Sequence, residues 1–190
     1  MKSLLAAVAG MIVLVGWGMV FWGFLADPLD VFHQLPNAPA VTSALVNSDT
    51  ATGSYFMPWP RSTHEQFERF VAQHKSGPFF RLSYVREGVD PNSPRKILLG
   101  CAHYLVVSLL AVALLGVTGI PSFNRRVAVL FLSGLMGTVF ITLGDPIWFH
   151  MPWDYTRGVL VYEVVSWFLL SVTIGKLVRP PDRLHIRREY

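Results

Sequence analysis

Five histidine and acidic residues are the side chains of this sequence whose types and positions would support chemistry. His103 and Glu163 lie inside long apolar segments, where a charged side chain costs about 2.5–3.5 kcal/mol on insertion scales. Asp145, His150 and Asp154 lie in the short stretch between two such segments. Imidazoles and carboxylates bind zinc, iron and copper, and they also exchange protons with bound molecules. If these side chains converge, they would form a metal site or a proton-relaying site.

A structural role explains the same residues without a cofactor. His103 and Glu163 would form a hydrogen-bonded pair that fixes helix register, an interaction worth about 0.6–2 kcal/mol in membranes. Asp145 precedes Pro146 and would end one helix in a turn, while Asp154 would cap the next helix. Metal-binding spacings such as HExxH and CxxC do not occur in the sequence. We therefore predict a buried polar pair and no cofactor, with a transition metal at the outer face as the alternative.

Four long apolar segments must position these side chains. The 190 residues are 52% hydrophobic and 15% charged, whereas about 25% of the residues of a soluble domain are charged. About 20 apolar residues cross the roughly 30 Å hydrocarbon layer of a membrane. Such segments cover residues 4–25, 97–120, 127–143 and 158–178. We predict a membrane protein of the all-α class with a bundle of four transmembrane helices.

The distribution of charge predicts the orientation of these helices. The first segment is longer than the apolar core of a signal peptide, so we expect residues 1–26 to be an uncleaved anchor. With the N-terminus in the cytoplasm, the outer loops hold nine of the 12 acids. The inner segments then hold eight of the 16 basic residues, namely Lys2, Arg125, Arg126, Lys176, Arg179, Arg183, Arg187 and Arg188. The positive-inside rule therefore predicts a bacterial inner-membrane protein with both termini in the cytoplasm.

This orientation would bring the candidate side chains to one level. His103 lies about six residues into the second segment and Glu163 about five into the fourth, which is roughly 8–9 Å below the outer boundary at 1.5 Å per residue. Asp145 ends the third segment near that boundary, and His150 and Asp154 follow in the loop above it. The five residues therefore predict one outer-facing pocket for a metal or another ligand.

Aromatic residues gather at the ends of the predicted spans. Trp148, Trp153 and Tyr155 lie between the third and fourth segments, and such residues are typical of the aromatic belts at headgroup level. We expect them to be interface aromatics rather than ligands. His33 follows the first segment, at the membrane surface, where it would be able to join the outer cluster.

The long connection over residues 27–96 predicts a small α+β cap outside the cytoplasm. "LPNAPAVTSALVN" reads as a short helix, and "GSYFMPWP" reads as a short strand that its prolines end. "RSTHEQFERFVAQHKSG" reads as a helix that Ser62 or Thr63 caps, and "PFFRLSYVREG" alternates as a half-buried strand does. Residues 97–178 then form the remaining three spans, and residues 179–190 form a basic cytoplasmic tail.

Several stretches of the chain carry a resemblance. "WGMVFWGFL", "LPNAPAVTSAL", "GSYFMPWP", "KSGPFFRLSYVREGVDPNSP" and "MPWDYTRG" are similar, in this order, to a family of small bacterial inner-membrane proteins. The resemblance implies four spans and an extracytoplasmic loop. It implies no activity, and it carries over no functional residue.

These features favour a non-enzymatic role. No nucleophile elbow and no phosphate-binding glycine loop occur in the sequence. We expect an accessory or assembly subunit of a larger membrane complex, whose partners are the lipid bilayer and other membrane-protein subunits. The basic tail would face anionic lipid rather than nucleic acid. The alternatives are a small protein that binds a metal or redox cofactor, and a protein that binds lipid or a small molecule at its outer face.

Overall fold

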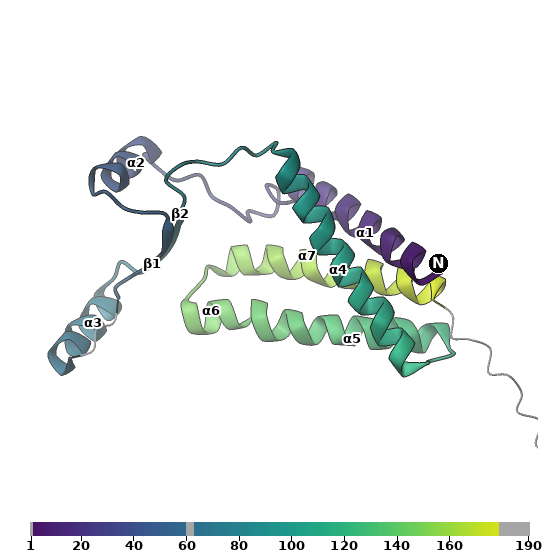
Figure 1. Cartoon of the computed structure of the whole chain (residues 1–190). Helices are drawn as coiled ribbons and strands as arrows, with labels where there is room; N and C mark the ends of the chain where they lie inside the picture. Colours follow the sequence, from purple (N-terminus) through teal and green to yellow (C-terminus); the bar gives the residue numbers. More distant parts are fainter. Residues whose placement is uncertain (1, 60–62, 179–190) are drawn as a thin grey trace, which may run out of the picture. The chain divides into compact units, whose positions relative to one another are not determined.

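The computed structural model describes residues 2–59 and 63–178 (Figure 1). The chain divides into two compact units, which we call the helical unit (Met1–Gln34 and Asn92–Tyr190) and the loop unit (Leu35–Pro91). The predicted basic tail, 179–190, lies outside the described residues. The elements of the described chain are, in order, α1 (Lys2–Val20), the π-helix η1 (Phe21–Leu25), α2 (Ala38–Asn47), β1 (Gly53–Met57), α3 (His64–Ser76), β2 (Phe80–Tyr84), α4 (Pro94–Thr118), α5 (Phe123–Thr142), α6 (Gly144–Phe149) and α7 (Trp153–Leu177).

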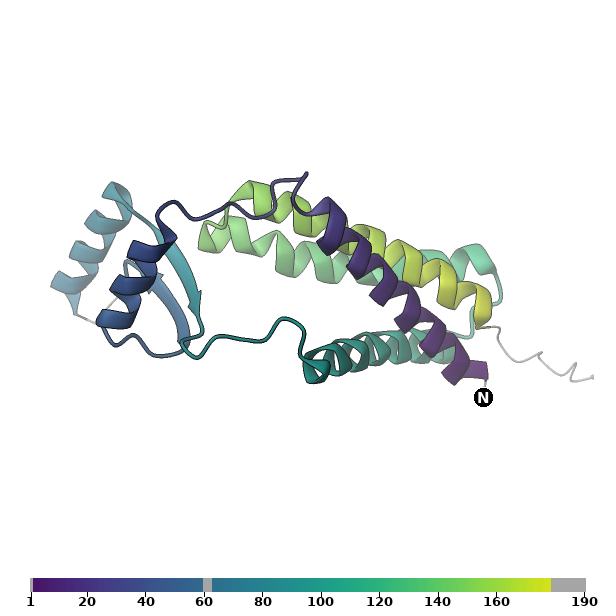
Figure 2. The same ribbon diagram turned by 90° about the horizontal axis from the view of Figure 1, so that it is seen from above.

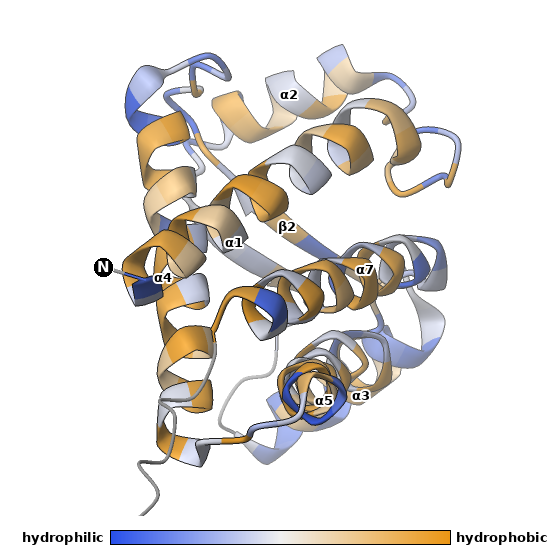
Figure 3. Cartoon of the chain, turned by 90° about the vertical axis from the view of Figure 1, so that its right-hand side faces the viewer, coloured by the Kyte–Doolittle hydropathy of each residue, from blue (hydrophilic) through white to orange (hydrophobic). Residues whose placement is uncertain are grey.

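Four helical stretches of the helical unit are long and apolar enough to span a membrane, which confirms this part of the prediction. They cover Lys2–Leu25, Pro94–Thr118, Phe123–Phe149 and Trp153–Leu177. The shortest has 24 residues, which extend about 36 Å at 1.5 Å per residue, more than the roughly 30 Å of a hydrocarbon layer. Hydrophobic residues dominate α1 and α4 along their length (Figure 3).

The third helical stretch runs further than the sequence predicts. Asp145 and Pro146 do not end it, because the short helix α6 follows α5 and continues to Phe149. Pro146 lies in the first turn of α6, where its missing N–H removes no helical hydrogen bond. The turn comes instead at His150, whose backbone has the left-handed conformation with φ of 52°.

The four long helices pack in the spatial order α4, α1, α7, α5. α1 packs along both α4 and α7, and α7 packs along α5, whereas α4 has only slight contact with α7 and α5 (Figure 2). Two glycines allow the closest approaches. A Cβ atom at Gly10 would lie 2.7 Å from Ser108 Oγ, and one at Gly134 would overlap the indole ring of Trp167. The absence of a side chain at Gly10 thus lets α1 approach α4 closely, and its absence at Gly134 lets α5 approach α7.

One basic residue is buried where α4, α5 and α7 end or begin. The Arg126 side chain donates from Nε to the carbonyl oxygen of Gly175 at 2.9 Å. Its terminal nitrogen also donates to the carbonyl oxygens of Ile120 and Pro121. A guanidinium beside the last carbonyls of a helix satisfies acceptors that have no partner within the helix. Arg126 therefore holds this end of the bundle together, in addition to contributing to the charge pattern of the sequence.

A second apolar cluster extends the helical unit beyond the predicted boundary at residue 26. Phe21, Ala26 and Val31 are buried together. Gly158 in α7 makes room for Val31, because a Cβ atom at this glycine would overlap the valine side chain. Residues 27–34 therefore belong to the helical unit, and the loop unit begins at Leu35.

The loop unit contains two helices and two strands in the order α2, β1, α3, β2. β1 and β2 pair antiparallel, with Gly53 opposite Tyr84 and Met57 opposite Phe80. The Thr63 side chain caps α3 by accepting a hydrogen bond from the backbone N–H of Gln66 at 3.3 Å. The unit is therefore a two-stranded antiparallel sheet, with α2 before its first strand and α3 between its strands.

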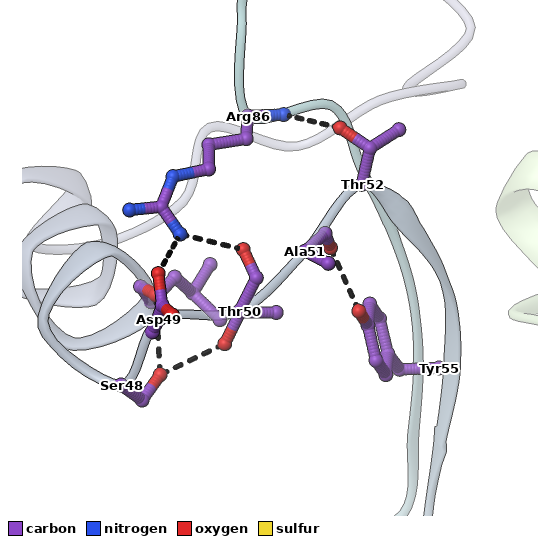
Figure 4. A network of polar contacts seen from close by, with 8 residues as sticks. Ser48, Asp49, Thr50, Ala51, Thr52, Tyr55 and Arg86 are labelled. Atoms are coloured by element: carbon purple, nitrogen blue, oxygen red, sulfur yellow. Dashed lines mark hydrogen bonds and ion pairs between the residues drawn. The ribbon is translucent and has the colours of Figure 1, made fainter.

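Polar contacts close the loop unit at one end of its sheet (Figure 4). The Arg86 guanidinium, which follows β2, contacts the Asp49 carboxylate at 2.5 Å and the carbonyl oxygen of Thr50 at 3.4 Å. The Arg86 backbone N–H donates to Thr52 Oγ1 at 3.0 Å, and Thr52 donates in turn to the Glu87 carboxylate at 2.7 Å. These bonds tie the segment between α2 and β1 to the end of β2.

Candidate functional site: a polar cavity in the helical unit

A cavity of about 200 Å³ lies among α1, α4 and α7. Most of its lining surface is apolar, and we call it the polar cavity after the polar side chains at one end. The two ionisable residues predicted inside spans both line it. It is lined by Leu14 from α1, by His103, Tyr104 and Val107 from α4, and by Tyr162, Glu163, Ser166, Trp167 and Leu170 from α7. The structure thus brings His103 and Glu163 to one site, as the sequence predicts.

His103 and Glu163 lie at similar distances along their helices and line the same cavity. His103 is nine residues beyond Pro94, where α4 begins, and Glu163 is ten residues beyond Trp153, where α7 begins. Because α4 and α7 run in the same direction (Figure 1), a rise of 1.5 Å per residue puts both side chains about 14–15 Å from the helix starts. This distance exceeds two helical turns.

A hydrogen bond from α5 orients the Glu163 carboxylate. Thr142 Oγ1 donates to Glu163 Oε2 at 2.6 Å, and Thr142 is buried. Within residues 2–59 and 63–178, no further hydrogen bond reaches this carboxylate. Thr142 was not predicted as a site residue; it lies four residues after Thr138 in α5, and both are buried. One carboxylate oxygen therefore remains available to a ligand or to another chain.

Two tyrosines join α4 to α7 beside the carboxylate. The hydroxyls of Tyr104 and Tyr162 are 2.6 Å apart and share a hydrogen bond. Trp17 of α1 donates from Nε1 to the carbonyl oxygen of Tyr162 at 3.0 Å. A Cβ atom at Gly18 would lie 3.4 Å from the Tyr104 hydroxyl, so this glycine leaves just enough room for the pair. The tyrosine pair was missed in the sequence, where its only signal is that each member adjoins a predicted site residue.

The His103 side chain is exposed in the single chain, although it lies more than two turns inside α4. Its ring contacts the ring of Tyr104, with centroids 5.1 Å apart. Among the described residues, no ion pair joins His103 to Glu163, so the predicted direct pair does not form within one chain. Both groups therefore line the cavity without a hydrogen bond or an ion pair between them.

Polarity changes along the cavity. His103, Tyr104, Tyr162 and Glu163 occupy the level nearest the start of α7. Val107, Trp167 and Leu170 line the levels one to two turns further along α4 and α7. The cavity is thus polar at one end and apolar at the other, a distribution that matches an amphiphilic molecule or an amphipathic helix surface.

The other three predicted site residues lie at the connection between α6 and α7. Asp154 is in the first turn of α7, but it does not cap this helix, because the residue at the cap position is Pro152. Its carboxylate contacts the Arg157 guanidinium and lies 3.9 Å from Nε2 of His33. His33 therefore lies beside Asp154 at the start of α7. Asp145 is half-buried, and His150 is exposed.

In the part of the chain that the structure describes, no group of three or more His, Cys, Asp or Glu side chains lies close enough to hold a metal ion. Within one chain, no such group is formed by His103, Asp145, His150, Asp154 and Glu163. The metal site predicted from these residues stays a hypothesis. The groups that do converge offer a carboxylate acceptor, a phenolic hydroxyl pair and an imidazole.

The aromatic residues of the connection divide into two kinds. Trp148 and Trp153 expose 76% and 56% of their surface, as residues at a membrane interface do. Tyr155 is half-buried instead, and its ring contacts that of Phe32 with centroids 5.7 Å apart. Tyr155 therefore packs against the second apolar cluster, which contains Phe21, Ala26 and Val31.

The fold defines the chain as an α-helical protein with four helices fit to span a membrane. The sequence matches no protein-family model, and neither a curated protein nor a solved structure matches it. The function therefore has to be inferred from the polar cavity.

Proposed function

We propose that the chain is a multi-pass protein of a bacterial inner membrane and serves there as a non-enzymatic accessory or assembly subunit. The observation that carries this proposal is the exposed imidazole of His103 in the middle of an apolar helix. A polar side chain at this depth is costly in contact with lipid, and such residues usually face another polypeptide or a water-filled cavity.

The packing of the helices supports the proposal. α4 packs on α1, but it has only slight contact with α7 and α5, so the side of the bundle that holds His103 is poorly covered by the chain itself. A further membrane helix would cover this side and would provide a partner for the free oxygen of Glu163. Interhelical hydrogen bonds of this kind are a common basis of assembly in membranes.

The orientation of the proposed subunit rests on charge. The basic residues flanking the connection between α4 and α5 and those after α7 favour a cytoplasmic location for these parts and for both termini. The loop unit would then lie on the extracytoplasmic side. Its sheet and helices would serve as a second contact surface for the complex.

Photocrosslinking tests the proposal. A benzophenone amino acid replaces His103 in one variant, and it replaces Leu132, an exposed residue of α5, in a matched control. We expect protein adducts of defined mass from position 103 in intact membranes, and predominantly lipid adducts from position 132. If position 103 also gives only lipid adducts, and gently purified protein is a single chain without partners, the subunit role is wrong.

A second candidate function is the binding of a small amphiphile. The observation that favours it is the change from polar to apolar lining along a cavity of about 200 Å³. An apolar cavity of about 150 Å³ can hold benzene, so one substituted ring would fit this space. Mass spectrometry of an organic extract of the purified protein tests this candidate. A bound amphiphile that is retained by wild type and lost on Leu170→Trp would support it, whereas an extract holding only bulk lipid would count against it.

A further inference from the structure

Among the described residues, no ion pair and no hydrogen bond joins the acid and the base that line the polar cavity. His103 on α4 and Glu163 on α7 line the same space at similar distances along their helices. His103 is exposed, and Glu163 uses one carboxylate oxygen for Thr142 and leaves the other free. The single chain therefore places an acid and a base that could pair, but do not pair with each other, on one side of the bundle.

The pair lies inside the apolar part of its helices. The two residues lie about 14–15 Å beyond the starts of α4 and α7 at 1.5 Å per residue, and roughly 8–9 Å inside the apolar segments that hold them. Acyl chains around such segments form no hydrogen bonds. A second membrane-embedded chain with polar side chains would provide the group that completes the pair.

A two-fold axis along the membrane normal would complete both pairs at once. Rotation about this axis keeps each residue at its own depth, and it brings the imidazole of one copy opposite the carboxylate of the other. Two-fold dimers are the commonest soluble oligomers, and their interface is self-complementary, because residue i meets residue j and residue j meets residue i. A surface that carries an acid and a base at similar depth satisfies this condition.

We propose that two copies of this chain associate through the polar cavity, so that His103 of each protomer contacts Glu163 of its partner. This inference rests on the proposed function as a membrane subunit, and it names the first partner as a second copy. Two symmetry-related pairs then form inside the apolar part of the helices, and the remaining surfaces stay available to other subunits.

A glycine beside His103 would permit close approach. Gly100 lies one turn before His103 on α4, and a Cβ atom there would meet nothing within 4 Å. Small residues at such positions let membrane helices come together. Gly116 is equally open, but at 100° per residue it lies on the opposite side of α4 from Gly100. The two glycines therefore provide a matched pair of positions for a test.

Complementation between single variants tests the exchange of partners. His103→Ala and Glu163→Ala chains carry different tags, and they are expressed alone and together. A dimer of either variant alone retains no His–Glu pair, whereas a mixed dimer retains one. We expect each variant alone to associate roughly tenfold more weakly than wild type, and the mixed dimer to recover about threefold. Mixed dimers no more frequent than random pairing predicts would overturn the proposal.

Steric substitutions give an independent readout. Gly100→Leu should abolish the dimer in detergent and in nanodiscs, whereas Gly116→Leu should leave it intact. Both variants should keep the helical content of wild type by circular dichroism, since neither position contacts the rest of its chain. Equal effects of the two substitutions would overturn the inference.

The two proposals fail in different ways. If wild type is monomeric and position 103 crosslinks to a different protein, the self-association is wrong and the subunit role stands. If position 103 crosslinks to no protein, both are wrong.

Discussion

Thr142 of α5 donates a hydrogen bond of 2.6 Å to the carboxylate of Glu163 in α7, and this bond joins two helices that also pack along their length. Thr142→Val keeps the shape of the side chain and removes the donor. We expect the free energy of unfolding to fall by about 1–2 kcal/mol, because the carboxylate loses its only hydrogen bond from the described chain. Unfolding of the full chain by SDS, followed by circular dichroism, measures this loss.

Thr142→Ser is the matched control for this bond, because serine keeps the hydroxyl. It should retain most of the stability of wild type. A Thr142→Val protein as stable as the serine variant would show that the bond contributes nothing to folding.

The contact between Gly134 and Trp167 predicts a strong asymmetry between two neighbouring glycines of α5. A Cβ atom at Gly134 would overlap the indole ring, whereas one at Gly137 would meet nothing within 4 Å. We expect Gly134→Ala to lower the free energy of unfolding by about 1–3 kcal/mol through overpacking. Gly137→Ala should be neutral or should raise it by up to about 1 kcal/mol, because alanine favours the helix. Thermal unfolding in detergent compares the two, and equal transition temperatures would contradict the packing described above.

Sequence patterns located the helices and the central polar residues for a clear physical reason. A run of apolar residues long enough to cross a membrane is visible in any sequence, and a charged residue within such a run stands out. His103 and Glu163 were found in this way, and both line the polar cavity.

The sequence did not identify the role of residues whose types occur in many structural settings. Tyrosine occurs both inside and at the edges of membrane helices, so the sequence does not single out Tyr104 and Tyr162. Only the structure shows that their hydroxyls meet, at the place where α4 and α7 come together. The Asp145–Pro146 step was read as the end of a helix, because a proline usually interrupts one. The chain instead starts a new helical segment at Gly144, in which Pro146 occupies the first turn. Whether a proline ends or begins a helix depends on the backbone that precedes it, which residue type alone does not determine.

The burial of Arg126 predicts that two adjacent arginines contribute very differently to stability. Arg126 is 6% exposed and donates to three carbonyl oxygens, whereas Arg125 is exposed. We expect Arg126→Met to lower the free energy of unfolding by roughly 3 kcal/mol, since buried carbonyls lose charged donors. Arg125→Met should change it by less than about 0.5 kcal/mol. SDS unfolding provides the comparison.

Both variants remove one positive charge from the same connection, so an effect through membrane orientation would be the same for each. Arg126→Lys should recover only part of the loss, because an ammonium group lacks the planar set of donors that reaches several carbonyls. Full recovery by lysine would show that charge, rather than the geometry of the guanidinium, stabilises this end of the bundle.

The hydrogen bond from Thr52 to Glu87 predicts a pH dependence in the loop unit. This bond is the largest cause that lowers the pKa of the Glu87 carboxyl from its ordinary value of 4.5. A depressed pKa in the folded state means that the stabilisation is present above the ordinary pKa and is lost as the pH falls through the folded pKa. Thr52→Val should therefore raise the pKa of Glu87, which a carboxyl-carbon NMR titration of the full chain in detergent measures. Thr50→Val serves as the control, because Thr50 bonds to Ser48 and not to Glu87. A pKa that rises equally in both variants would assign the shift to the general charge of the loop unit rather than to the Thr52 hydroxyl.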